Sequence, residues 1–100
     1  MNKTIDLTIK SGEVFNLLIY NDLDSITELN PGNYLLDPID SDFFVINYCQ
    51  WLRYTRESES PALLINLTAL RRGNTKVSGL VQLSHVNPLY FRINYNITII

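Results

Sequence analysis

The sequence predicts one mainly β domain over residues 1–100, an antiparallel β-sandwich or jelly-roll-like fold of about seven to eight strands. Three observations predict it. Apolar and polar residues alternate with a period of two along much of the chain, as in strands with one buried face. Turn-forming residues recur roughly every ten residues. Hydrophobic residues make up 46% of the chain and charged residues 18%, which is enough apolar material for a core without disulfides.

The first two strands are expected over residues 4–9 and 15–19. A three-residue loop at 11–13 would place Ile9 opposite Phe15 and gather the apolar side chains of both strands on one face. A two-residue turn would set apolar residues against polar ones, so the longer loop is preferred, because the buried face determines the register. The sequence therefore predicts a β-hairpin here.

A turn-rich stretch follows over residues 21–33. One short helix over 24–30, capped by Asp24 or Ser25, is an alternative to a plain loop. Pro31-Gly32 is typical of a type II turn, and a strand is expected to resume at Tyr34.

The segment 43–56 is apolar on both strand faces. Such a strand is usually central in a sheet and covered on both sides. A bulge between Asn47 and Gln50 would instead exchange the two faces along the strand. The single cysteine, Cys49, excludes an internal disulfide and is expected to be a small buried hydrophobic residue.

The segment 61–72 has two interpretations. As a helix, it would have Ser60 as N-cap, Pro61 in the first turn and Gly73 after the last. As a strand, it would form a hairpin with 77–83 around a loop at 73–75. The regular alternation of 77–83 favours the hairpin, and the short helix over 61–72 is the alternative.

The last strand, over residues 89–100, alternates apolar and polar residues up to Ile100. Arg92 is its one charged residue, and it contains no proline. An edge strand of this kind would be a template for pairing with another chain. It is therefore expected to lie in the centre of a sheet or to be completed by a partner through strand addition.

Several function classes find no support in the composition. The formal net charge of −2 gives no basic face for nucleic acid. No apolar run approaches the ~18 residues of a membrane span, and no signal peptide is recognisable. The expected location is cytoplasmic on synthesis, or within an assembled particle. No cofactor is expected, because the glycines are scattered and form no phosphate-binding loop. No catalytic residue is expected, because no nucleophile motif accompanies the lone histidine, His85.

Aromatic and arginine side chains are the best candidates for contact with a partner protein, because both are favoured at protein interfaces. Two groups qualify: arginines that follow aromatic residues at the end of the apolar segment 43–56, and a pair of adjacent arginines at an expected loop tip. The candidate partner-binding residues are Trp51, Arg53, Tyr54, Arg56, Arg71 and Arg72.

Asp37, Asp40 and Asp42 form a weaker candidate, for calcium. Calcium is bound by several carboxylate and carbonyl oxygens, but these residues lack the spacing of an EF-hand loop. Aspartate is also favoured in turns because its side chain binds its own backbone, so no metal site is predicted.

The preferred function is that of a non-enzymatic structural or interaction protein, such as a component of a virion, phage particle or other assembly. The alternatives are a small protein-binding module that inhibits a host macromolecule, and a carbohydrate-binding domain. The expected partner is a protein, either a second copy in a homo-oligomer or another chain.

Overall fold

The computed structural model describes residues 2–21, 29–53, 61–84 and 89–100. The fold of these residues is a β-sandwich, which confirms the predicted class and strand number. The elements are β1 (Asn2–Ile9), β2 (Val14–Tyr20), the 3₁₀ turn η1 (Pro31–Asn33), β3 (Tyr34–Leu36), β4 (Phe44–Leu52), β5 (Ala62–Ala69), β6 (Gly73–Ser84) and β7 (Leu89–Ile99).

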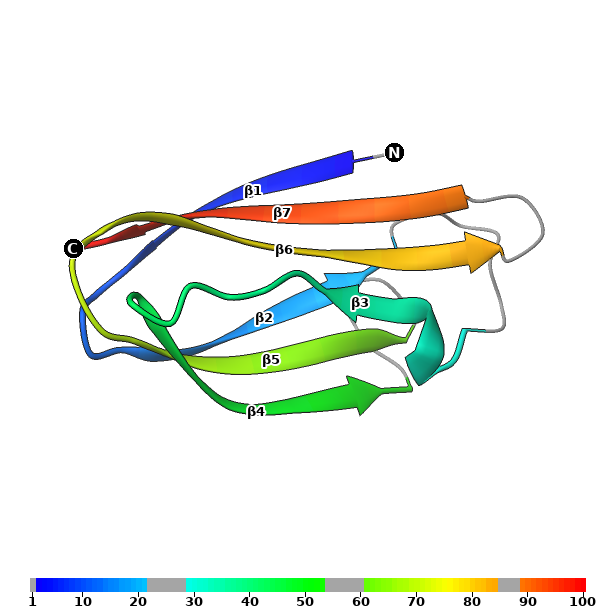
Figure 1. Cartoon of the computed structure of the whole chain (residues 1–100), viewed down its shortest axis with the longest axis horizontal. Helices are drawn as coiled ribbons and strands as arrows, with labels where there is room; N and C mark the ends of the chain where they lie inside the picture. Colours follow the sequence, from blue (N-terminus) through cyan, green and yellow to red (C-terminus); the bar gives the residue numbers. More distant parts are fainter. Residues whose placement is uncertain (1, 22–28, 54–60, 85–88) are drawn as a thin grey trace.

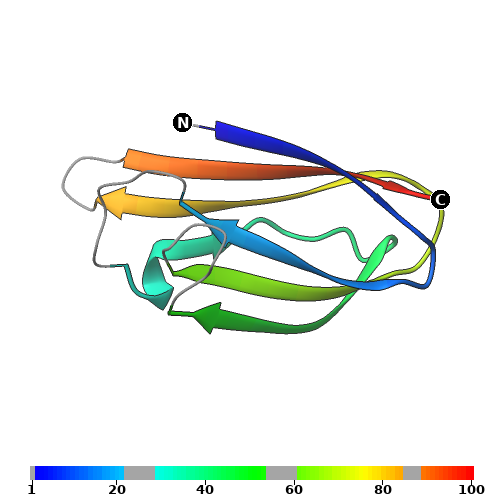
Figure 2. The same cartoon turned by 180° about the vertical axis from the view of Figure 1, so that it is seen from behind.

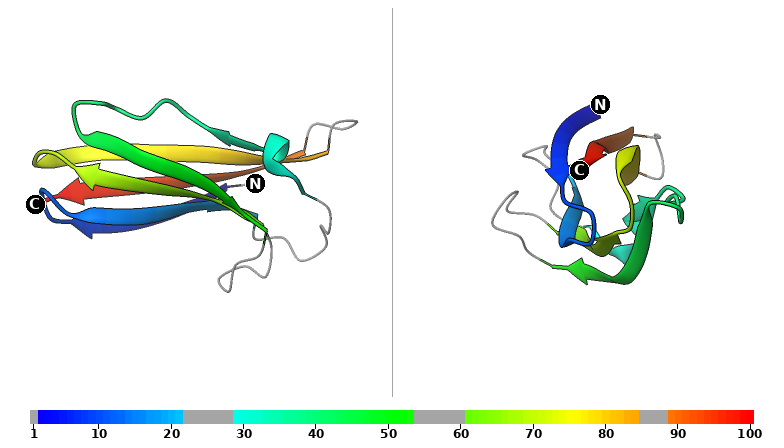
Figure 3. Two further views of the ribbon diagram at one scale, coloured as in Figure 1. Left: turned by 90° about the horizontal axis from the view of Figure 1, so that it is seen from below. Right: turned by 90° about the vertical axis from the view of Figure 1, so that its left-hand side faces the viewer.

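The strands form two sheets that pack face to face (Figure 1). The four-stranded sheet has the order β1-β7-β6-β3, and the three-stranded sheet has the order β2-β5-β4. Neighbouring strands are antiparallel, as expected, except that β1 runs parallel to β7. The view along the long axis shows the two layers (Figure 3).

The core lies between the sheets, and the alternating pattern predicts its residues correctly. Each strand except β4, where a bulge exchanges the two faces, points side chains of mainly one parity inward. The largest fully buried apolar side chains are Leu17, Ile19, Ile65 and Leu67 from the three-stranded sheet, and Val77, Val81, Ile93 and Ile97 from the four-stranded sheet.

The predicted first hairpin is wrong as a pairing, because β1 and β2 belong to different sheets (Figure 2). The turn between them crosses from one sheet to the other, with Gly12 at a φ of 87°. Its backbone is held by Ser11 N, which donates to Ile100 O at 2.9 Å, and by Gly12 N, which donates to Ala69 O at 2.8 Å. The apolar faces of the two strands therefore belong to opposite layers of the core.

The segment 61–72 is a strand, β5, and the alternative helix is wrong. The hairpin with 77–83 is also wrong, because β5 pairs with β2 and β4 while β6 pairs with β3 and β7. The expected loop at 73–75 lies within β6. Period-two alternation reports which face is buried, and both strands bury that face in the same core from opposite sheets.

β4 lies at an edge of the three-stranded sheet, so its interpretation as a central strand is wrong. The alternative is confirmed: the register with β5 shifts between Ile46 and Tyr48, and the extra residue is Asn47. Cys49 is exposed, contrary to expectation, because it lies on this edge.

β7 lies between β1 and β6, so the closing strand is central. Its partners on both sides come from the same chain, which explains how it can be long and almost uncharged.

Pro31-Gly32 forms the start of a 3₁₀ turn and not a type II turn, and β3 begins at Tyr34 as predicted. Most of the alternative helix over 24–30 lies outside the described residues.

Candidate functional site

One end of the sandwich, here called the loop end, is formed where β2, β4 and β6 end and where β5 and β7 begin. It lies away from the C-terminus (Figure 1). The opposite end holds the β1–β2 turn at 10–13 and the β5–β6 turn at 70–72. The loop end is defined by the described residues Tyr20, Asn21, 29–34, 51–53, Pro61, Leu89 and Tyr90.

Buried polar side chains are concentrated at the loop end. Asn21 is 1% exposed and Asn33 is 5% exposed, and they are the buried polar residues of the described chain. The Asn33 side chain donates from Nδ2 to the carbonyl oxygen of Gln82, at 2.8 Å. A buried amide is costly unless it is hydrogen-bonded, so this bond fixes the 29–34 segment to the end of β6.

The 3₁₀ turn is closed by reciprocal hydrogen bonds. Asn30 Oδ1 accepts from Gly32 N at 2.9 Å, and Asn33 Oδ1 accepts from Asn30 N at 3.0 Å. Pro31 occupies the first position of the turn. A backbone N–H at that position would have no acceptor within the turn, so proline loses no hydrogen bond there. The turn is therefore closed by hydrogen bonds within its own four residues.

Tyr34 and Trp51 join the two sheets at this end. Their rings meet edge to face, with centroids 6.4 Å apart, and the Tyr34 hydroxyl donates to Pro61 O at 2.7 Å. Burial raises the pKa of Tyr34 to about 12, and the approach of the Trp51 indole is the smaller, opposing effect. Trp51 Nε1 is buried and meets no acceptor in hydrogen-bond geometry within the described residues. Trp51 therefore supports the loop end mainly by packing.

The candidate partner-binding residues do not form one group. Trp51 is half-buried and Arg53 is exposed, both at the loop end. Arg71 and Arg72 are exposed at the opposite end, where the Arg71 guanidinium lies 5.3 Å from the centroid of the Phe43 ring. Tyr54 and Arg56 lie outside the described residues. The described candidates therefore form two pairs at opposite ends of the sandwich, Trp51 with Arg53 and Arg71 with Arg72.

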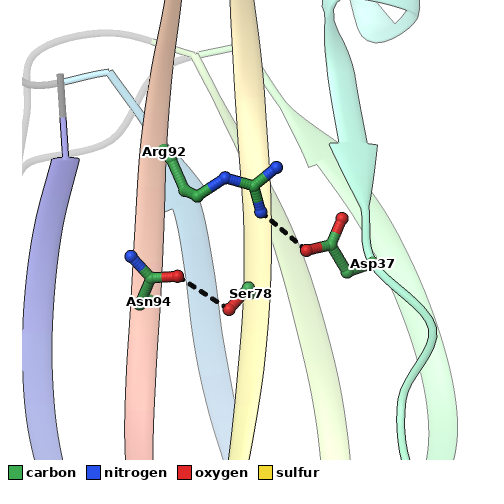
Figure 4. A network of polar contacts seen from close by, with 4 residues as sticks. All are labelled: Asp37, Ser78, Arg92 and Asn94. Atoms are coloured by element: carbon green, nitrogen blue, oxygen red, sulfur yellow. Dashed lines mark hydrogen bonds and ion pairs between the residues drawn. The ribbon is translucent and has the colours of Figure 1, made fainter.

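The three aspartates have other contacts that account for them. Asp37 forms an ion pair with Arg92, with 2.6 Å between Oδ2 and Nη1 (Figure 4). Asp40 Oδ1 accepts from the backbone N–H of Asp42 at 2.9 Å, which is the turn role expected of aspartate. The described residues contain no group of three His, Cys, Asp or Glu side chains that could hold a metal ion.

Sequence reasoning missed the polar part of the loop end. Asn30, Asn33 and Tyr34 carry its hydrogen bonds, but their segment was interpreted only as a turn and a strand start. The available signal was an asparagine directly before a proline, with a second asparagine three residues after the first, which is the spacing of a reciprocal cap.

Two apolar side chains at the loop end are exposed. Leu89 is 43% exposed and Tyr90 is 42% exposed, at the start of β7. Together with Arg53 they give this end the aromatic, aliphatic and arginine side chains that anchor protein interfaces.

Within the described residues, no helix is long and apolar enough to cross a membrane.

No family model matches the sequence, and no curated protein sequence matches it significantly. Among solved structures, the fold is similar along almost its whole length to the cysteine protease inhibitor EhICP2 from Entamoeba histolytica. It shares 14% sequence identity with this chain at a TM-score of 0.61, and the alignment covers 99% of this chain and 95% of the inhibitor. At that identity the likeness concerns the fold.

Proposed function

We propose that this protein is a small, non-enzymatic protein-binding domain that inhibits a cysteine protease by placing its loop end on the enzyme. The observation that carries the proposal is the extent of the structural likeness. The alignment covers 99% of this chain and 95% of a cysteine protease inhibitor, so a domain of this size and shape is enough for that activity. The proposal develops the binding-module alternative of the sequence analysis.

The shape of the molecule supports contact through its end. The domain is 41 Å long and only 21 by 20 Å across, so the loop end is one of the two narrow ends of an elongated molecule. Enzyme active sites are concave, and a narrow tip fits a cleft better than a flat sheet face does.

Hydrogen bonds between the described segments of the loop end also support the proposal. Asn33 and Tyr34 tie its segments together by hydrogen bonds to Gln82 O and Pro61 O. A surface that is already ordered loses less conformational entropy on binding, which favours tight complexes.

One motive for a particle component was the long, weakly charged closing strand, which needs a neighbour on each side. β7 has neighbours on both sides within the chain, so this motive is removed. No described feature favours that function over inhibition.

The direct test is inhibition of a papain-type cysteine protease acting on a fluorogenic peptide. Trypsin-type serine and zinc-dependent proteases serve as class controls. We expect reversible, stoichiometric loss of the cysteine protease activity and full activity of the controls. Undiminished activity at a large molar excess of the protein, across several papain-type enzymes, would contradict the proposal.

Matched variants locate the contact surface. Leu89→Asp changes the loop end, and Leu70→Asp changes the opposite end at a residue of similar exposure, 43% against 45%. Arg53→Glu and Arg72→Glu form a second pair with equal charge changes. We expect the loop-end variants to weaken inhibition about tenfold or more, and the opposite-end variants to match the wild type. Equal effects within each pair would exclude the loop end as the contact.

A further inference from the structure

The edge strands of the two sheets differ in how they are protected from pairing with another chain. The edges are β1 and β3 in one sheet and β2 and β4 in the other. β1 carries Lys3 at the same parity as the core residues Ile5 and Leu7, and the Lys3 side chain is half-buried with Nζ 5.4 Å from the centroid of the Tyr20 ring. A lysine that points inward from an edge strand opposes strand addition, because pairing would bury its charge.

The β2 edge is occupied by a side chain of the other sheet. The Tyr95 hydroxyl accepts from Leu18 N at 3.3 Å and donates to Leu18 O. Ala69 N donates to Glu13 O, which shows that odd-numbered residues of β5 and β2 bond to each other. The backbone groups of Leu18 therefore point away from β5, and Tyr95 satisfies both of them at the edge.

β3 is a short edge of three residues. The next residue, Asp37, donates its backbone N–H to Ser78 O, and Pro38 then follows without an N–H to offer. These features limit the pairing of β3 with a strand of another chain.

β4 differs from the other three edges. It has nine residues with no charge and no proline, and Val45, Ile46 and Tyr48 are 46%, 46% and 51% exposed. The bulge at Asn47 interrupts the strand, and beyond it the register with β5 is regular over residues 48–52. β4 therefore presents a neutral edge of regular strand that ends beside the loop end.

The backbone groups that face outward from β4 follow from the ladder. Leu70 N donates to Phe43 O, so the even-numbered residues of β5 bond to β4. Cys49 pairs with Ile65, an odd-numbered residue, so the Cys49 N–H and C=O point away from β5. The same alternation directs the backbone groups of Trp51 outward. Phe44 agrees with this alternation. It pairs with Ala69, an odd-numbered residue, and its N–H donates to Asp40 O at 3.1 Å and not to β5.

We propose that an extended segment of the target protein adds to the β4 edge along residues 48–52 as a fourth strand of the smaller sheet. This inference rests on the proposed function. Main-chain hydrogen bonds to Cys49 and Trp51 hold the segment, and its side chains are uncharged where they pack beside Tyr48.

The size of the edge argues for a target segment and against a second copy of this chain. Five strand residues span about 17 Å, whereas a stable dimer buries about 800 Å² on each partner. Pairing of two β4 edges alone gives a small interface. A protease that also contacts the loop end gains the remaining area there, because Arg53 directly follows β4.

Cys49→Pro and Cys49→Lys test the edge. The proline removes an outward N–H without removing a bond to β5, and the lysine reproduces the protection given by Lys3 on β1. Cys49→Ser keeps the backbone N–H and is the matched control. Circular dichroism and thermal unfolding establish that each variant is folded. A folded Cys49→Lys keeps the test available if the proline variant does not fold.

The readout is the inhibition constant against the papain-type protease that the wild type inhibits. We expect the proline and lysine variants to inhibit about tenfold more weakly, and the serine variant to match the wild type. Amide hydrogen exchange supplies a second readout: the Cys49 amide should exchange fast in the free protein and slowly in the complex.

Each other outcome contradicts the inference in a distinguishable way. Unchanged inhibition by the proline and lysine variants, with Leu89→Asp still weakened, overturns strand addition and leaves the proposed function intact. A wild type that inhibits no papain-type protease overturns both. A wild-type dimer that becomes monomeric in Cys49→Pro shows that the edge binds a second copy, and so overturns the assignment to the target.

Discussion

Tyr95→Phe removes one oxygen atom that joins the two sheets. The Tyr95 side chain lies on β7 and is 5% exposed, and its hydroxyl bonds to both backbone groups of Leu18 on β2. Phenylalanine keeps the ring and its packing, so the loss is confined to these hydrogen bonds and to the two Leu18 groups left without them. A part-buried group left unsatisfied costs about 1–3 kcal/mol. In a domain of this size each kcal/mol lowers the melting temperature by roughly 4–8 °C.

The same variant changes the alkaline stability. Burial raises the pKa of Tyr95, and separately that of Tyr34, to about 12 from 10.0. Between these pH values the unfolded tyrosines lose protons that the folded protein retains, so the free energy of unfolding falls as the pH rises. The fall is roughly 1.4 kcal/mol per pH unit for each tyrosine. Tyr95→Phe removes one of these two contributions, so its stability should fall less steeply than that of the wild type between pH 10 and 12.

Urea unfolding followed by tryptophan fluorescence measures both effects, at neutral pH and across the alkaline range. Tyr48→Phe is the matched control, because it removes the hydroxyl of a tyrosine that is 51% exposed on β4. We expect the control to stay within about 0.5 kcal/mol of the wild type. A Tyr95→Phe protein that is as stable as the control, with the alkaline slope of the wild type, would refute this role of the hydroxyl.

Three further substitutions should rank by the contacts they disturb, each measured by urea unfolding. Gly79→Ala should cost about 1–3 kcal/mol, because its Cβ would lie 2.8 Å from Ile19 Cδ1, and no loss would show that the core adjusts freely. Asn33→Ala should cost about 1–3 kcal/mol by leaving a β6 carbonyl without its donor, and a neutral result would contradict its anchoring role. Asp37→Asn should cost less than about 1 kcal/mol, because the side chains of Asp37 and Arg92 are 44% and 36% exposed to solvent. A larger loss would contradict the expectation that this exposed ion pair is weak.

The sequence predicted strands and buried faces better than strand neighbours. Alternation over β1, β2, β5 and β6 identifies the side chains that enter the core, and those predictions hold. The two predicted hairpins fail because a strand has the same period whether the following strand lies beside it or in the facing sheet. The turn at Gly12 crosses between layers through bonds to Ile100 and Ala69, which are distant in sequence.

The candidate site shows the same limit. An arginine beside an aromatic residue can be found by inspection, and Arg53 does lie at the loop end with Trp51. Arg72 is a candidate from the same sequence argument about arginines, but it lies at the opposite end, because strand order decides which turns come together. The outward-facing edge of β4 could not be predicted either, since it depends on which strands pair with β5.

The most direct test of the account is a titration of a papain-type cysteine protease with the wild-type protein, parallel to Leu89→Asp and Leu70→Asp. We predict that activity falls linearly to zero at one equivalent of wild type and of Leu70→Asp, while Leu89→Asp gives a shallow curve. Full protease activity at several equivalents of wild type, or equal curves for the two variants, would contradict inhibition through the loop end.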